Sequence, residues 1–427
     1  MHRYPDHHYT PRVATTTAPF VNGRRLMDRL MSLADIGPIP NGGCCRLALT
    51  AEDGIGRDLV VNWMRELDLD VRIDAVGNVI GTWNVGTGAP VMTGSHIDTV
   101  RTGGKYDGNL GVLAGLEVIE TLQEAGITPA RPLAVGFFTN EEGARFAPDM
   151  LGSLVYVGGM STEEALNTFA IDGARLGDEL QNIGYAGSAP CPGPSPHAFV
   201  ELHIEQGPLL EAHGVTIGAV SGVQGISWRE LTIVGQSNHA GTTPMALRHD
   251  PAYVVGEITV FLRKLATRFG GNQVCTVGKV DLTPNLVNVV PGSATMTIDV
   301  RNTDEFLLRQ AEHEIEAFLA ELAVSEGVSI SARVLARFVP IVFDERVVSI
   351  VERHAQRQGN TVERMPSGAG HDAQMFARVC PTGMIFVPSV RGISHNPAEH
   401  TDEADLITGS NILLATMLEL ASTEFSA

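Results

Sequence analysis

The sequence predicts an α/β protein whose larger domain is interrupted by a smaller α+β insert. In the first half of the chain, short apolar strands alternate with amphipathic helices, an order typical of a sheet covered by helices. From about Gly222 the order becomes strand, helix, strand, strand, helix, strand, which is the ferredoxin-like arrangement. We therefore expect one domain over 20–220 and 332–427, an insert over 221–331, and a flexible terminus over 1–19.

Hydrophobic spacing places the elements of the larger domain. Residues 57–67 put their apolar side chains on one face of a helix, and residues 110–125 are apolar on most faces, as in a buried helix. Strands are predicted at 70–74, 78–83, 90–94, 132–139 and 197–205. Several of these strands end on polar residues, and in α/β sheets functional side chains gather at strand ends.

The insert follows with strands at 226–234, 273–280 and 293–300 and helices at 251–269 and 305–326. After Val339 the chain returns to helix and strand patterns, which include 344–358 and 382–387. This return indicates that the larger domain is discontinuous in sequence.

Composition and charge narrow the possible partners. Lys and Arg total 30 and Asp and Glu total 49, a formal net charge of −19, which disfavours nucleic acid or an anionic membrane as the main partner. No apolar stretch approaches the ~20 residues of a membrane span, and residues 1–20 lack the apolar run of a secretory signal. The five cysteines are scattered without a Cys-x-x-Cys pair, which favours reduced thiols in the cytoplasm and leaves metal binding to His and carboxylates.

The sharpest motif is Gly-Ser-His-Ile-Asp-Thr-Val at 94–100, directly after a predicted strand. His96 and Asp98 are two residues apart, so they project on the same side. A metal-binding histidine needs an acceptor for its second ring nitrogen, and Asp98 is placed to provide one. A glycine-lined loop then presents Asp107 just before a helix, where its two oxygens could bridge two cations.

Three more segments add candidate ligands. Glu141 and Glu142 lie side by side at the end of a strand, so one can bind metal while the other handles a proton. His203 lies in the motif Glu-Leu-His-Ile-Glu-Gln-Gly at 201–207, and His395 lies in the motif Gly-Ile-Ser-His-Asn-Pro at 392–397. Any one of these segments alone would read as an ordinary polar turn, but together they predict three histidines and two carboxylates around a pair of ions. Zinc suits this set, with Mn²⁺, Co²⁺ or Ni²⁺ as alternatives.

Polar residues in three other segments are candidates for binding the substrate. His239 lies in a loop rich in Gly, Ser and Thr, where an imidazole can donate to a developing oxyanion. Arg301 ends a strand of the insert and offers a fork that fits a carboxylate, although a surface ion pair is the plainer interpretation. His371 and Asp372 end a glycine-rich loop, where Asp372 could simply cap the next helix.

The motifs at 94–100, 103–108, 140–143, 201–207 and 394–400 resemble those of the amidase, hydantoinase/carbamoylase family, a branch of the two-zinc aminoacylases and carboxypeptidases. The resemblance covers about residues 25–420 with the motifs in the expected order. It implies a mixed-sheet catalytic domain of the two-zinc exopeptidase type, and an insert that serves as a lid and pairs two chains into a homodimer.

The same resemblance assigns roles. It implies that the metal ligands are His96, Asp107, Glu142, His203 and His395, with Asp107 bridging. Glu141 would be the general base, which leaves Glu142 as the ligand. Asn288 and Arg301 would hold a substrate carboxylate. Gln206 would add a further substrate contact, and His371 would have a supporting role.

The expected activity is metal-dependent cleavage of the carbamoyl C–N bond of an N-carbamoyl-L-amino acid, giving the amino acid, carbon dioxide and ammonia. Glu141 would take a proton from the attacking water, and His239 would steady the oxyanion. Allantoate, ureidoglycolate and N-carbamoyl-β-alanine are alternative ureido substrates, whereas a dipeptidase or aminoacylase is less favoured. A non-catalytic binding module is the alternative from another class, and it predicts neither bound metal nor hydrolysis.

Overall fold

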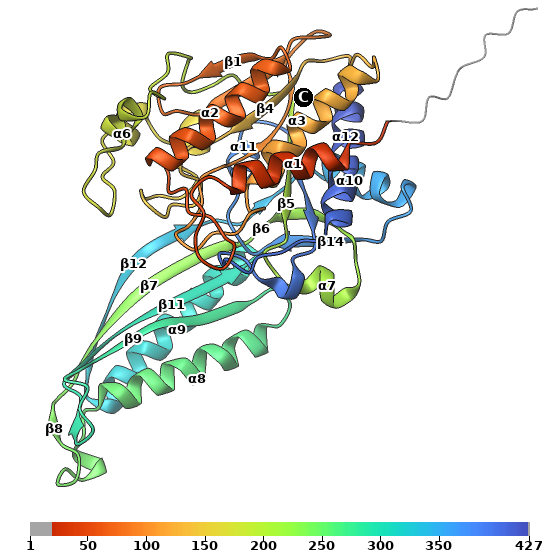
Figure 1. Cartoon of the computed structure of the whole chain (residues 1–427). Coiled ribbons are helices and arrows are strands. Elements are labelled where there is room, and N and C mark those ends of the chain that lie inside the picture. Colours follow the sequence, from red (N-terminus) through yellow and green to blue (C-terminus); the bar gives the residue numbers. More distant parts are fainter. Residues whose placement is uncertain (1–18, 426–427) are drawn as a thin grey trace, which may run out of the picture.

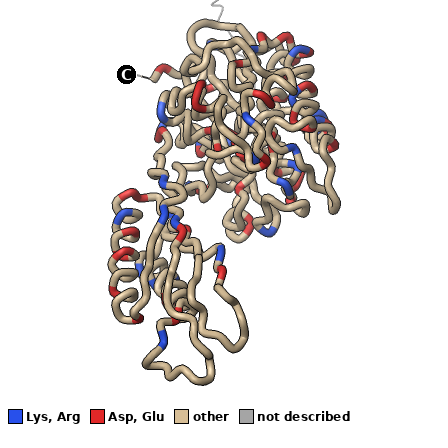
Figure 2. The backbone as a smooth tube through the Cα atoms, turned by 90° about the vertical axis from the view of Figure 1, so that its left-hand side faces the viewer, with Lys and Arg blue, Asp and Glu red and all other residues tan. Residues whose placement is uncertain are grey.

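A computed structural model describes residues 19–425 and shows a larger and a smaller part (Figure 1). The larger part combines segments from both ends of the chain, and the smaller part comes from the middle. Apart from Pro19, the terminus predicted over 1–19 lies outside the described residues. Acidic and basic residues are scattered over both parts (Figure 2).

The larger part is built around a mixed sheet. Among the described residues the sheet has nine strands, in the order β1 (Asp70–Ile73), β2 (Val79–Trp83), β4 (Leu133–Phe137), β3 (Val91–Ser95), β5 (Ala198–Ile204), β15 (Thr382–Val387), β6 (Ile217–Val223) and β13 (Ile341–Val342), with β14 (Val362–Ser367) also paired to β6. The central strands β4, β3, β5 and β15 are parallel, while β2 and β6 join them antiparallel. The mixed sheet of the predicted fold class is confirmed.

The four central strands are buried along their whole length. Continuous apolar runs form such strands because both faces of the sheet are covered. Since parallel strands end at the same edge, the loops that follow β3, β4 and β5 become neighbours although they lie far apart in the sequence.

Helices cover this sheet. They are α1 (Gly23–Ala34), α2 (Ala51–Glu66), α3 (Asn109–Glu124), α4 (Leu151–Tyr156), α5 (Thr162–Leu166), α6 (Leu176–Asn182), α7 (Leu209–His213), α10 (Glu345–Arg357), α11 (Asp372–Phe376) and α12 (Glu403–Ser422), with a 3-10 turn η2 (Val390–Gly392). α3 and α12 pack against each other and against β3 and β5. By length and composition α12 could cross a membrane, but 67% of its apolar window is buried inside the fold. It is therefore placed as a core helix.

The insert has its own sheet and its own core. The strand order is β12 (Ser329–Phe338), β7 (Gly225–Val234), β11 (Ser293–Asn302) and β9 (Val274–Thr283), all antiparallel. The helices α8 (Pro251–Phe269) and α9 (Glu305–Glu326) pack on this sheet and on each other. Their apolar residues form a cluster separate from that of the larger part. The chain order β7, α8, β9, β11, α9, β12 is the strand and helix order predicted for the insert.

The predicted boundary at residue 331 falls inside a strand. β12 pairs with β7 from Ser329 to Phe338, so its second half belongs to the sheet of the insert. The chain rejoins the larger sheet at β13, which pairs with Gly222 and Val223 of β6. We therefore propose that the insert is a domain that ends at Phe338, because its sheet and its core continue to that point.

A short ribbon extends from the insert. It consists of β8 (Asn238–His239), β10 (Val289–Val290) and the 3-10 turn η1 (Met245–Leu247). Figure 1 shows β8 at the end of the insert that is farthest from the larger sheet.

Candidate metal centre

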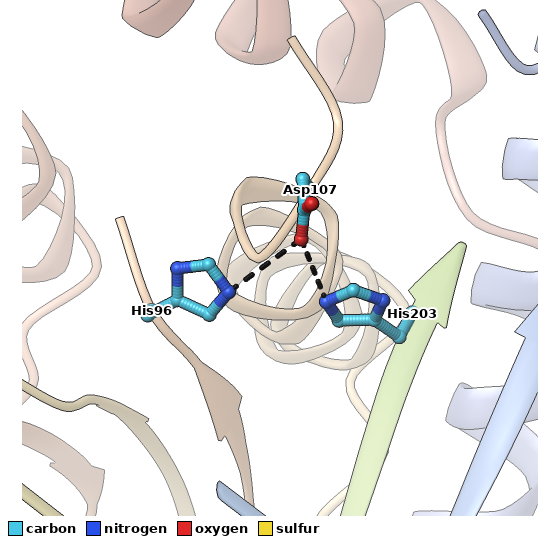
Figure 3. Close-up of side chains that lie close together, drawn as sticks. All are labelled: His96, Asp107 and His203. Atoms are coloured by element: carbon cyan, nitrogen blue, oxygen red, sulfur yellow. Dashed lines mark ion pairs between the residues drawn. The ribbon is translucent and has the colours of Figure 1, made fainter. Parts of the chain in front are cut away.

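Three buried side chains meet at the carboxyl edge of the central strands (Figure 3). His96 follows β3, His203 belongs to β5, and Asp107 precedes α3. The Oδ1 atom of Asp107 lies 3.6 Å from Nε2 of His96 and 3.2 Å from Nε2 of His203. These residues offer one ligand atom each, all within 4.8 Å of one another, which is a suitable arrangement for one cation.

The second oxygen of Asp107 faces another group. Its Oδ2 lies 3.4 Å from Nε2 of His395, and that nitrogen is 3.2 Å from Oε2 of Glu142. Ligand atoms of Asp107, Glu142 and His395 also lie within 4.8 Å of one another. The five residues expected to bind metal are thus together, and the two oxygens of Asp107 point to different halves of the cluster.

The loop before α3 fits this cluster only with glycine at position 108. Gly108 has a φ of +67°, and a Cβ there would lie 2.4 Å from the ring of His96. Its backbone N–H donates to Nε2 of His203 at 3.2 Å. Glycine therefore allows the backbone that carries Asp107 to approach both histidines closely.

Main-chain carbonyls orient the two histidines. The Nδ1 atom of His96 donates to the carbonyl oxygen of Asp98 at 2.8 Å, and Nδ1 of His203 donates to that of Ile204 at 2.8 Å. Both rings consequently present Nε2 to the cluster. The expectation that the Asp98 side chain holds His96 is wrong, because the main chain of the same residue takes that position.

The Asp98 carboxylate instead holds the turn that follows β4. Its two oxygens accept the backbone N–H groups of Glu141 and Glu142 at 3.3 and 3.4 Å. The preceding Asn140 has a φ of 57°, a left-handed conformation that asparagine adopts more readily than most residues. Its amide group donates to the carbonyl oxygen of Phe146. These contacts direct the two adjacent glutamates into the site.

Glu141 differs from its neighbour in its surroundings. Its Oε2 atom lies 3.3 Å from Nε2 of His96, and the side chain is buried. Burial raises the pKa of Glu141 well above its usual range, an effect that the positive charge of His96 opposes. Glu141 is therefore a candidate for the proton transfers of the site, as its position beside Glu142 predicted.

Glu399 and Ser394, which were not among the predicted site residues, form hydrogen bonds that hold Asp107 in place. Oε1 of Glu399 accepts the backbone N–H groups of Tyr106 and Asp107 at 3.0 and 3.2 Å. The Ser394 hydroxyl lies 3.0 Å from Oε2 of Glu399 and 3.1 Å from Oδ2 of Asp107. Both residues belong to the motif at 394–400 that carries His395, and that position is the signal from which they could have been found.

Helix α11 is not capped by Asp372. That carboxylate is fully buried, and neither of its oxygens has a hydrogen-bond partner among the described residues. The first turn of α11 is held instead by Glu201 of β5, whose carboxylate accepts the backbone N–H of Ala373 at 2.8 Å. The preceding His371 lines the site, and burial lowers its pKa well below the usual range, which keeps the imidazole neutral.

A pocket opens over the cluster, between the larger part and the insert. Its lining residues are His96, Asp107, Glu141, Glu142, Asp149, His203, Gln206, Ile226, Trp228, Arg301, Ala369, Gly370, His371 and His395. Gln206 donates to Oδ2 of Asp107 at 2.9 Å, and Arg301 reaches the pocket from β11. All the metal-ligand candidates, together with Glu141, Gln206, Arg301 and His371, thus face one space.

Two predicted site residues lie elsewhere. His239 is in β8 and is paired with Val289 of β10, next to Asn288. The carbonyl oxygen of Asn288 accepts the backbone N–H of Ala240 at 3.0 Å. Both residues therefore belong to the ribbon that projects from the insert, and neither lines the pocket.

The fold and the cluster are those of a metal-dependent hydrolase that cleaves amide C–N bonds. The model of the peptidase family M20/M25/M40 matches residues 92–419, and the chain belongs to this family. This match confirms the resemblance inferred from the motifs.

Individual relatives agree with the family. An N-carbamoyl-L-amino-acid amidohydrolase of Rhizobium meliloti is 40% identical over 404 residues, which are 94% of this chain and 97% of that protein. An allantoate amidohydrolase of Escherichia coli (strain K12) is 38% identical over 394 residues, 91% of this chain and 96% of that protein. The crystal structure of an amidase of the hydantoinase/carbamoylase family from Burkholderia multivorans superposes with a TM-score of 0.92 at 43% identity, covering 95% of this chain and 99% of that one.

Proposed function

We propose that the protein hydrolyses the carbamoyl C–N bond of an N-carbamoyl-L-amino acid. The observation that carries this proposal is the pocket itself, in which a metal-ligand cluster, a buried glutamate and an arginine face one another. A ureido group at the cluster and a carboxylate at Arg301 would occupy its two sides. Relatives named N-carbamoyl-L-amino-acid amidohydrolase support the same substrate class.

The cofactor we propose is a pair of divalent ions, with zinc first and Mn²⁺, Co²⁺ or Ni²⁺ as alternatives. One ion would be held by His96, His203 and Oδ1 of Asp107, and the other by Glu142, His395 and Oδ2 of Asp107. When bound, such ions polarise a carbonyl group and lower the pKa of water toward ~7.

The side chains of the pocket would then perform the proton transfers and hold the substrate. Glu141 would accept the proton of the attacking water and pass it to the leaving nitrogen. Arg301 would bind the carboxylate, and Gln206, already held by Asp107, would contact the same substrate. His371 would line the pocket as a neutral imidazole. Asp98 would contribute by holding the turn that carries Glu141.

His239 and Asn288 require a further step. Because neither residue lines the pocket in this arrangement, a role for His239 at the oxyanion and for Asn288 at the carboxylate needs the ribbon to approach a pocket. We propose that the insert provides this approach, either by closing over its own domain or by pairing two chains into a homodimer. Sedimentation velocity of the purified protein tests the dimer, which a purely monomeric species would contradict.

Allantoate and N-carbamoyl-β-alanine remain the alternative substrates, and the allantoate amidohydrolases among the relatives favour the former. Both molecules carry a ureido group and a carboxylate, so the same pocket residues would serve. A non-catalytic binding module fits less well, because the family is one of hydrolases. We also propose a cytoplasmic location, in keeping with the five unpaired cysteines.

Ammonia release tests this function directly. The purified protein, loaded separately with Zn²⁺, Mn²⁺, Co²⁺ or Ni²⁺, is given a panel of N-carbamoyl-L-amino acids, N-carbamoyl-β-alanine and allantoate. We expect the highest kcat/KM for a member of the first group and no activity after chelation. Selective turnover of allantoate would transfer the assignment to the alternative, and a metal-loaded protein inactive on the whole panel would contradict the proposal.

A further inference from the structure

Arg301 lies at the end of β11, facing the pocket from the insert, and its guanidinium group has a fixed set of partners. Nε donates to Oδ1 and Oδ2 of Asp299 at 3.0 and 3.1 Å, and Nη2 donates to Oδ2 at 2.8 Å. Nη1 donates to the carbonyl oxygen of Gly368 at 2.6 Å. One edge of the guanidinium group is thus paired with a carboxylate, and one terminal nitrogen is tied to the larger part.

The sheet explains why Asp299 can hold this group. Asp299 and Arg301 are two residues apart in β11, so their side chains lie on the same face. Their partners across the ladder in β7 are Trp228 and Ile226, which also line the pocket. The guanidinium carbon of Arg301 lies 5.7 Å from the ring centroid of Trp228, within the range of a cation–π contact.

The hydrogen-bond donors of Arg301 can be counted. A guanidinium group has five N–H bonds, and the contacts with Asp299 and Gly368 use three of them. One hydrogen on Nη1 and one on Nη2 remain. When the two N–H bonds are parallel, a carboxylate accepts such a pair in a bidentate contact.

We propose that Asp299 is a positioning residue that presents the two free donors of Arg301 to the substrate carboxylate. This inference rests on the proposed function, which makes the carboxylate the ligand of Arg301. Asp149 and Glu142 also line the pocket and would attract a guanidinium group that is not held. Asp299 therefore prevents Arg301 from turning toward these acids, and it lowers the conformational entropy lost when the substrate binds.

The plainer interpretation of Asp299 and Arg301 is an exposed ion pair. Such pairs contribute little to the stability of a protein. Three features separate Asp299 from that case. The contact is bidentate, both side chains are about three-quarters buried, with exposures of 23% and 27%, and the guanidinium group also has Trp228 and Gly368 as partners. The guanidinium group thus has three protein partners and keeps a donor on each terminal nitrogen for a ligand.

The test uses the metal-loaded full-length protein and two substrates, the best N-carbamoyl-L-amino acid of the panel and its carboxamide, which lacks the negative charge. Asp299→Asn should raise KM for the acid by between ~10-fold and ~100-fold, the loss expected from a misplaced binding group, with a much smaller change in kcat. For the carboxamide, which forms no charge pair with Arg301, the variant should change KM much less than for the acid. In Arg301→Gln the addition of Asp299→Asn should cause no further loss, because one residue acts through the other.

Glu230→Gln is the matched control. Glu230 lies in β7 of the same sheet and forms an ion pair with Arg333 at 2.9 Å, but it does not line the pocket. This variant should keep the KM of the wild type for both substrates. A purely structural role for Asp299 predicts equal losses with the acid and the carboxamide, and additive losses in the double variant, and either result would overturn the inference. Wild-type protein that is inactive on every ureido acid would instead remove the proposed function, and with it the ligand assigned to Arg301.

Discussion

Individual contacts around the cluster show what a motif can and cannot specify. The pair His96 and Asp98 has the spacing of a histidine and its carboxylate acceptor, yet the acceptor is the main-chain carbonyl oxygen of Asp98. Because every residue has a main-chain carbonyl oxygen, the sequence does not indicate which one accepts the hydrogen bond of His96. The freed carboxylate binds the backbone of Glu141 and Glu142. Asp98 thus makes different contacts from those that its position suggests.

The residue with the most direct test is Glu141. We expect Glu141→Gln to lower kcat by at least ~10²-fold, because the amide cannot accept a proton from water. Metal content, measured by emission spectroscopy, should stay at the wild-type level. The neighbouring variant Glu142→Gln is the matched control, since it removes a ligand and should lower the metal content. Near-normal turnover by Glu141→Gln would refute its role as the base.

Glu399 leads to a second prediction at this scale. Its carboxylate holds the backbone of Tyr106 and Asp107. Residues that orient a metal ligand typically affect metal affinity by ~10-fold to ~100-fold. Glu399→Ala should therefore lose metal during dialysis against a competing chelator, whereas Glu403→Ala, at the exposed start of α12, should retain it. Equal retention by the two variants would contradict this role.

The cysteine thiols provide a prediction that depends on pH. Burial raises the pKa of Cys191 to about 12 and that of Cys380 to about 11. At pH 8 only about one molecule in a thousand, or fewer, would carry either thiolate, against roughly a quarter for an ordinary thiol of pKa ~8.5. Both cysteines should react slowly with iodoacetamide in the folded protein and quickly in urea. Peptide mass spectrometry measures this, and fast labelling of either cysteine in the folded protein would contradict its raised pKa.

At the scale of elements, a buried arginine joins the end of α1 to the loops of the cluster. Arg46 is fully buried and donates to the carbonyl oxygens of Leu33 and Ile36, to that of Ile97, and to the side chain of Asn109. Ile97 lies between His96 and Asp98, and Asn109 is the first residue of α3. One side chain thus links the loop of His96 to the start of α3, two residues after Asp107.

We expect Arg46→Met to destabilise the protein by ~3 kcal/mol or more, because several buried acceptors lose their donor at once. The urea midpoint of unfolding measures this loss. Arg65→Met, on the exposed side of α2, should change the midpoint little. Similar midpoints for the two variants would show that water replaces the guanidinium group without cost.

The start of α2 shows why element boundaries were harder to predict than elements. The apolar spacing predicts a helix from residue 57, but α2 begins at Ala51. Gly54 and Gly56 interrupt the apolar pattern and lower helix propensity. They are tolerated because the backbone packs closely there: a Cβ on Gly56 would lie 3.2 Å from Arg46. The Thr50 side chain accepts the backbone N–H of Asp53 and caps the helix.

For the whole molecule, the pocket depends on how the two domains meet. Trp228 and Arg301 come from the insert, whereas the candidate metal ligands come from the larger part. The contact between Arg301 and the Gly368 carbonyl oxygen joins the two across the pocket. Binding of a substrate carboxylate by Arg301 would therefore also favour one arrangement of the domains.

Metal removal is the prediction at this scale. Without cations, the acidic side chains of Asp107, Glu141 and Glu142 lie close together in one buried region, which costs stability. A chelated protein should unfold at a lower temperature, and adding metal to ~100 times its Kd should restore about 2.7 kcal/mol. Calorimetry of the two forms measures this difference. Identical Tm values would indicate that the cluster does not bind metal in the folded protein.

The sequence by itself predicted the cluster of candidate metal ligands and the family of this protein. Each candidate ligand lies in a short motif at a strand end, and strands and helices follow from local spacing, so both can be read without the fold. Tertiary structure alone decided the acceptor of His96, the contacts of Glu399 and the contacts of Arg301. It also placed His239 and Asn288 on a ribbon away from the pocket. The physical reason is that these facts depend on contacts between distant segments and on the placement of one domain against another, which local patterns do not record.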